Sequence, residues 1–167
     1  MSGRSFPGFS GPLLPLLFVV ICSPGIAQSV SAEPNARERG LAAETFAKER
    51  LAIWQQRLSL ADWKITIIMS HPSDLKPRTL GNIHWDADKK SAVIRVLDAS
   101  DYKMSYRDML DDMEFTVVHE LIHLELSSLP RSEASRRDEE HAVNQIAEAL
   151  LKLDRSNREQ TATGNKQ

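Results

Sequence analysis

One stretch constrains this chain more than any other: "TVVHELIHL", residues Thr116–Leu124. Its apolar residues fall on every side of a helix, and a helix that is hydrophobic nearly all round is a buried helix. Glu120 would then lie in the interior, where a carboxylate without a partner is costly. A buried helix that carries one glutamate and two histidines therefore needs a reason to hold them.

The spacing of these polar residues supplies a reason. His119 and His123 are four positions apart, so they stand on the same helical face, one turn from each other. With Glu120 directly after the first histidine they form the HExxH pattern, which combines two zinc ligands with a general base. The alternative is a core helix with two satisfied histidines and a glutamate that reaches solvent, which would bury three polar groups without any gain.

A catalytic zinc usually has three protein ligands and an open position. The following segment, "EEHAVNQIAEAL", offers Glu139, Glu140 and His141. Helical periodicity places both glutamates one turn before its apolar face, while His141 points about 100° further round than Glu140. We expect Glu140 as the third ligand, with Glu139 and His141 as alternatives, and Asn144 as a hydrogen-bond partner of a zinc-bound histidine. The run "RRDEEH" also suits a solvated charge cluster at the start of a helix.

Periodicity along the rest of the chain predicts an α+β domain over residues 35–153. Asn35 is a plausible N-cap for a first helix, and "WKITIIMS" alternates as a strand. "GNIHWD" and "SAVIRVLD", joined by the turn "ADKK", predict a hairpin that completes a small three-stranded sheet. The HExxH helix is expected from about residue 105 to 127, and a packed C-terminal helix from Ser132 or Ser135, with Val143, Ile146, Ala147, Leu150 and Leu151 as its apolar face. Residues 154–167 have almost no apolar content and predict a disordered tail.

The N-terminus has the pattern of a secretory signal. Arg4 precedes the apolar run "LLPLLFVVIC", and small residues follow it. We expect a signal peptide over residues 1–32 with cleavage near Ala27 or Ala32, the alternative being an uncleaved anchor. The mature protein would then be exported, as a periplasmic or secreted bacterial protein, without stable membrane association.

Charge and cysteine usage narrow the chemistry further. The chain has 21 basic and 23 acidic residues, so it lacks the basic excess that attracts nucleic acid. Cleavage of the signal would remove Cys22, the single cysteine. Neither a disulfide nor a thiolate is then available, and a metal must be held by histidine, aspartate or glutamate.

"VVHELIHLEL" followed by "EEHAVNQIAEAL" resembles the small gluzincin-type zinc metallopeptidases, short bacterial and phage proteins with an HExxH helix and a glutamate on the next helix. "SLADWKITI" and "TLGNIHWDADKKSAVIRVLD" are similar to the sheet that precedes the active helix in such proteins. The resemblance covers roughly residues 41 to 152 and implies a minimal zincin-like fold. It also implies one Zn²⁺ per chain, held by His119, His123 and Glu140, with Glu120 as the catalytic base. A second resemblance, to SprT-like metalloproteases, would favour a histidine as third ligand.

The function expected from these residues is zinc-dependent hydrolysis of peptide bonds in a peptide or protein substrate. The zinc activates a water, and Glu120 takes its proton and delivers it to the leaving amine. Tyr102, Tyr106, His84 and His141 are candidates for a further donor to the oxyanion. The alternative is an exported, non-catalytic zinc-binding or scaffold module, but a structural site has no use for a base, so the presence of Glu120 favours the enzyme.

Overall fold

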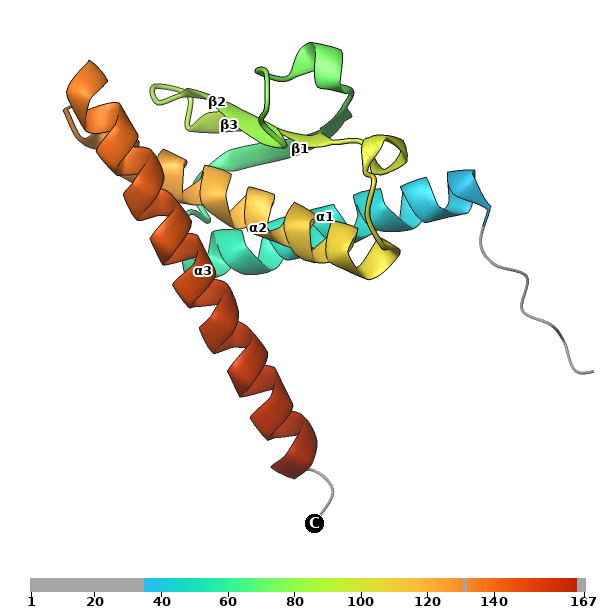
Figure 1. Ribbon diagram of the computed structural model, residues 1–167. Helices are drawn as coiled ribbons and strands as arrows, with labels where there is room; N and C mark the ends of the chain where they lie inside the picture. The colour runs from blue at the N-terminus through green and yellow to red at the C-terminus, as the bar shows by residue number, and fades with distance from the viewer. Residues whose placement is uncertain (1–34, 131, 165–167) are drawn as a thin grey trace, which may run out of the picture. The chain divides into compact units, whose positions relative to one another are not determined.

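The computed structural model describes residues 35–130 and 132–164, so the predicted signal peptide lies outside the described residues. Its α+β class and its order of elements confirm the coarse prediction (Figure 1). The elements are α1 (Ala36–Arg57), β1 (Lys64–Ser70), β2 (Gly81–Asp86), β3 (Ser91–Leu97), α2 (Tyr106–Glu125) and α3 (Glu133–Gly164), with short 3₁₀ turns at Pro72–Asp74, Ala99–Asp101 and Leu126–Ser128.

The first helix begins where the sequence predicts. The Asn35 side chain accepts a hydrogen bond from the Glu38 backbone N–H at 3.0 Å, and the Glu38 carboxylate accepts one from the Asn35 N–H at 3.0 Å. This reciprocal capping box satisfies two backbone donors that the first turn of a helix leaves without partners.

The sheet has the order β1-β3-β2. Strands β2 and β3 form the expected antiparallel hairpin, whereas β1 pairs with β3 in parallel. Ile94 of the central strand is opposite Ile67 on one side and Ile83 on the other. Alternation turns Ile67 and Ile94 toward the core, where both are buried. Strand β2 is left at one edge, beside α2.

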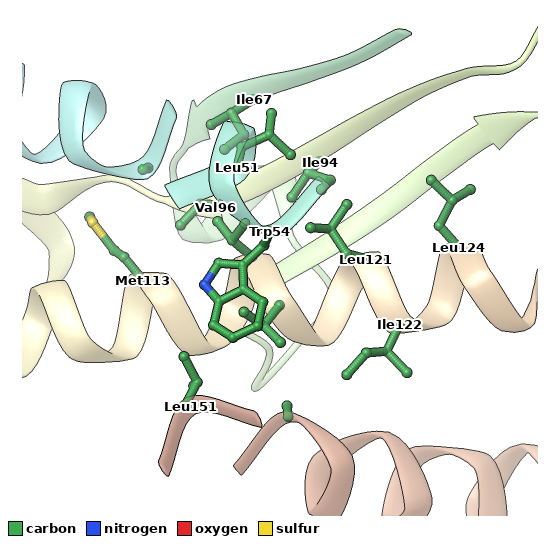
Figure 2. Packing of buried hydrophobic residues seen from close by; sticks show 14 of the residues in the cluster. Leu51, Trp54, Ile67, Ile94, Val96, Met113, Leu121, Ile122, Leu124 and Leu151 are labelled. Atoms are coloured by element: carbon green, nitrogen blue, oxygen red, sulfur yellow. The ribbon is translucent and has the colours of Figure 1, made fainter. Parts of the chain in front are cut away.

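Helix α2 is central to the core, because it contacts α1, α3, β2 and β3. Figure 2 shows Leu121 and Leu124 pointing toward the sheet, while Ile122 points to the opposite side, toward α3. Neighbours on several sides explain why this helix is apolar nearly all round. These contacts hold α2 in one orientation about its own axis, and they thereby also fix the directions in which His119, Glu120 and His123 point.

Helix α3 packs on α2 through one stripe of its predicted apolar face. Val143, Ala147 and Leu151 are buried, as expected. Ile146 is 42% exposed, so its assignment to the packed face was wrong. The next buried position on the same side of the helix is Asp154, a charged residue.

The prediction of a disordered tail over residues 154–167 was wrong for most of that segment, because α3 continues to Gly164. The Asp154 carboxylate lies 2.8 Å from Arg57 Nη1, 3.3 Å from Arg50 Nη2 and 2.9 Å from Arg158 Nη2. Extending a helix that is already nucleated costs little, and residues 155–163 contain no glycine or proline to stop it. Low apolar content therefore indicated exposure here and not the absence of a helix.

Within the described parts of the chain, none of the helices combines the length and the apolar character that crossing a bilayer requires.

Candidate metal centre

The two histidines of α2 face each other across one helical turn. Their Nε2 atoms are 3.1 Å apart, and the rings meet edge to face with centroids separated by 4.7 Å. The side chains are only 15% and 11% exposed for His119 and His123, respectively. Two nitrogen lone pairs therefore converge on one point at the wall of a pocket.

Helix α3 adds Glu140 to this pair. Its Oε2 lies 3.4 Å from His119 Nε2, and its Oε1 lies 3.3 Å from His123 Nε2. A tetrahedral zinc ion with ligand distances of about 2.0–2.1 Å sets neighbouring donor atoms about 3.3–3.4 Å apart. The three side chains thus offer donors of the right type at spacings that fit such an ion, and they form a possible metal-binding triad.

Glu139 takes a different position from Glu140. Its Oε1 lies 2.9 Å from Nδ1 of His123, on the far side of that ring from Nε2. A carboxylate at Nδ1 favours the tautomer with the proton there, so that Nε2 carries the lone pair with which a histidine binds a cation. Among the three candidates for third ligand, only Glu140 faces both Nε2 atoms, and His141 is exposed.

The environment of His119 favours a neutral ring. Burial is the main cause that lowers the pKa of His119, and the nearby His123 lowers that pKa further. Glu140 and the nearby Asn144 side chain act in the opposite direction and raise that pKa. Asn144 therefore lies beside His119 as expected, although Nδ1 of His119, the atom that should donate to it, has no hydrogen-bond partner among the described residues. A neutral imidazole is the form that ligates a metal.

Glu120 lies next to the triad and is only 7% exposed. Burial raises the pKa of its carboxyl to about 7, and repulsion from Glu140 contributes, while His123 and Lys76 lower that pKa. These shifts apply to the metal-free protein, and a bound cation would lower the pKa again. In the metal-free protein this carboxyl therefore gains and loses its proton near neutral pH.

The start of β2 is in close contact with α2 beside Glu120. A Cβ atom at Gly81 would lie 2.4 Å from Thr116 Cγ2, 2.8 Å from the Arg95 carbonyl oxygen and 3.6 Å from Glu120 Oε1. A residue without a side chain is needed here because backbone and helix approach this closely. Gly81 therefore sets the edge strand directly against the helix that carries the triad.

An open pocket of about 600 Å³ is lined by the triad together with Glu120 and Glu139. It lies between α2, β2, the segment 76–80 and the start of α3, so it is built from segments that are far apart in the sequence. The structure brings together all four predicted site residues: His119, Glu120, His123 and Glu140.

The candidates for an oxyanion donor are not placed in this pocket. The Tyr102 hydroxyl donates to Asp112 Oδ2 at 3.0 Å, and Tyr106 lies under the Arg39 guanidinium, 5.1 Å from its ring centroid. His84 and His141 are exposed. None of the four candidates is among the residues that line the pocket.

Three basic side chains of the pocket escaped the sequence analysis: Lys76, Arg78 and Arg136. Lys76 and Arg78 belong to a segment without periodicity, which gave no indication of the direction in which they point. Arg136 belongs to the run interpreted as a solvated charge cluster. Arg136 lies three and four residues before Glu139 and Glu140 in the sequence. That short separation could have indicated that Arg136 lies near the site.

Comparison of this chain with models of protein families, with curated proteins and with solved structures gave no match.

Proposed function

We propose that this protein is a zinc-dependent peptidase of the minimal gluzincin kind. The observation that carries the proposal is the convergence of three side chains. The Nε2 atoms of His119 and His123 are 3.1 Å apart, and the two carboxylate oxygens of Glu140 lie 3.4 and 3.3 Å from them, which suits a tetrahedral zinc. Glu120, buried beside this triad, supplies the base that a purely structural zinc site does not need. His119, His123 and Glu140 would hold one zinc ion per chain.

The bound zinc would supply a Lewis acid that activates water and polarises the carbonyl of the scissile bond. The protein contributes the positioning and the proton transfer. Glu139 holds His123 by its Nδ1, so that the Nε2 of that ring faces His119 and Glu140. The carboxylate of Glu120 accepts the proton from the attacking water and delivers it to the leaving amine.

The edge strand beside the site suits an extended substrate. Among the described strands, β2 pairs with β3 and lies at the edge of the sheet, so a peptide could add to its outer edge as a further strand. Trp85, on the same strand, lines the pocket and would contact a substrate side chain. Gly81 brings the start of this strand next to Glu120, so a peptide aligned along β2 would pass the proposed base.

Two further expectations accompany the proposal. The N-terminal sequence supports export, which would make the enzyme a periplasmic or secreted bacterial protein. The near balance of charge gives no reason to expect a nucleic-acid partner.

The test compares peptide cleavage by zinc-loaded wild type, Glu120→Gln and Glu125→Gln on a diverse peptide mixture, with products identified by mass spectrometry. Glu125 belongs to the same helix but is exposed, so it is a matched control. We expect Glu120→Gln to lose at least about a hundredfold in rate and Glu125→Gln to match wild type. Zinc binding without cleavage in the wild type would instead support a non-catalytic zinc module.

A further inference from the structure

Three basic side chains line the proposed active-site pocket, which also holds the carboxyl groups of Asp112, Glu120, Glu139 and Glu140. Lys76 and Arg78 come from the segment before β2, and Arg136 comes from the first turn of α3. All three are exposed, and none forms an ion pair or a side-chain hydrogen bond with another described residue.

None of the acidic side chains of the same pocket forms an ion pair with these three cations, and most of them contact other groups. Glu139 is bound to His123, and Glu140 faces both histidines. Asp112 accepts the hydroxyl of Tyr102. Glu120 remains for proton transfer, and Lys76 is close enough to lower the pKa of that carboxyl. The three cationic groups are therefore not held by ion pairs with the described residues of the pocket, and their donors are available to an anionic group of a ligand.

The turn that carries two of the cations is ordered by its own hydrogen bonds. The Lys76 carbonyl accepts from the Thr79 N–H at 3.1 Å and from the Thr79 hydroxyl at 2.8 Å. Arg78 has a φ of 66°, in the left-handed region that non-glycine residues rarely adopt. The chain continues from this turn into β2 at Gly81, so a peptide aligned along β2 would have one part beside Lys76 and Arg78.

We propose that the pocket selects peptides with a carboxylate near the scissile bond, and that Lys76, Arg78 and Arg136 bind it. This inference rests on the proposed peptidase function for the reaction but not for the binding of the anion. A guanidinium binds a carboxylate through two parallel N–H···O bonds, and an ammonium adds a compact charge. The carboxylate belongs either to the free C-terminus of the substrate or to an aspartate or glutamate side chain.

Binding is measured first, by calorimetry on wild type with zinc removed and on zinc-loaded Glu120→Gln, in which turnover of the probe is expected to be at least about a hundredfold slower. Four acetylated probes distinguish the source of the carboxylate: Ala₄ with a free C-terminus, Ala₄ amide, Ala-Ala-Glu-Ala amide and Ala-Ala-Gln-Ala amide. We expect the free acid, the glutamate peptide or both to bind about tenfold more tightly than the neutral partner probe. Equal binding of acidic and neutral probes would overturn the inference.

The residues are assigned with charge-removing variants. Lys76→Gln and Arg136→Gln should each reduce the preference for the acidic probe several-fold, while Lys103→Gln and Arg137→Gln should keep it. Lys103 and Arg137 are exposed residues outside the pocket, and Arg137 is the immediate neighbour of Arg136. A preference that survives in the Lys76→Gln, Arg78→Gln, Arg136→Gln triple variant would contradict the assignment.

Cleavage of the peptide mixture by wild type separates this inference from the peptidase proposal. Cleavage enriched near acidic residues or C-termini supports both. Cleavage without such enrichment, together with equal binding of the probes, supports the peptidase and refutes the selection of a carboxylate. Absence of cleavage with retained preference for acidic probes refutes the peptidase and supports the anion site.

Discussion

Glu139 Oε1 lies 2.9 Å from Nδ1 of His123, while the next residue along the helix faces Nε2 of the same ring. Two consecutive glutamates thus contact opposite nitrogens of one imidazole. They have different roles in the proposed centre, one as an orienting partner and the other as a ligand.

This division of roles predicts different effects on zinc affinity. Glu139→Ala keeps all three donors but removes the group that fixes the tautomer of His123, so zinc affinity should fall by about 10–100-fold. Glu139→Gln should lose less, because its amide oxygen can still accept from Nδ1. Competition with a chromophoric chelator measures both values. An unchanged affinity in Glu139→Ala would show that the contact does not orient the ring.

Gly81 provides a prediction about stability. Gly81→Ala places a Cβ 2.8 Å from the Arg95 carbonyl oxygen and 2.4 Å from Thr116 Cγ2, so we expect a loss of about 1–3 kcal/mol in the free energy of unfolding. Gly40→Ala is the matched control, because its Cβ meets nothing within 4 Å in α1 and should stabilise by about 0.5–1 kcal/mol. Urea denaturation of both variants tests this, and a neutral Gly81→Ala would contradict the close approach of β2 to α2.

A network of ion pairs joins the three helices through Arg50 and Arg57 of α1, Glu114 of α2 and Asp154 of α3. Loss of Asp154 should therefore lower the free energy of unfolding strongly. Asp154→Ala leaves the Arg50 guanidinium, whose side chain is 11% exposed, with Glu114 as its only carboxylate partner among the described residues. Removing one member of a buried ionic network costs on the order of 3 kcal/mol. Glu159→Ala, an exposed acid on the same helix, should change the free energy of unfolding by less than about 0.5 kcal/mol.

Truncation tests the structural role of the end of α3. A chain ending after Asp154 keeps the residue that joins α3 to α1, whereas a chain ending after Leu153 loses it. We expect the melting temperature of the shorter chain to be several degrees lower, since a loss of about 1 kcal/mol in the free energy of unfolding lowers the melting temperature by about 2–8 °C. Equal melting temperatures would mean that the contacts of Asp154 do not stabilise the fold.

Local patterns in the sequence predicted the elements well, because each depends on residues close together in the chain. Asn35 as an N-cap, the alternation in β1 and the hairpin of β2 and β3 follow from such patterns. The parallel pairing of β1 with β3 was not predictable in this way, because the two strands are far apart in the chain and no sequence pattern near either strand indicates its partner.

The site shows the same limit. The spacing of His119 and His123 specifies one helical face, so these residues could be placed together from sequence. The choice between Glu139 and Glu140 depends on the rotation of α3, which periodicity gave only to within about one residue, as the exposure of Ile146 shows. Lys76 and Arg78 reach the pocket through an irregular segment, and irregular segments carry no periodic pattern from which a direction could be inferred.

The central claim is tested most directly by the zinc content of the purified full-length protein after refilling at neutral pH. Wild type, Glu140→Ala and His141→Ala are compared by elemental mass spectrometry. The account predicts about one zinc per chain in wild type and in His141→Ala, whose exposed histidine lies outside the triad, and loss of that zinc in Glu140→Ala. Wild type that takes up no zinc would contradict the metal centre, and "TVVHELIHL" would then be a core helix with a coincidental spacing of polar residues.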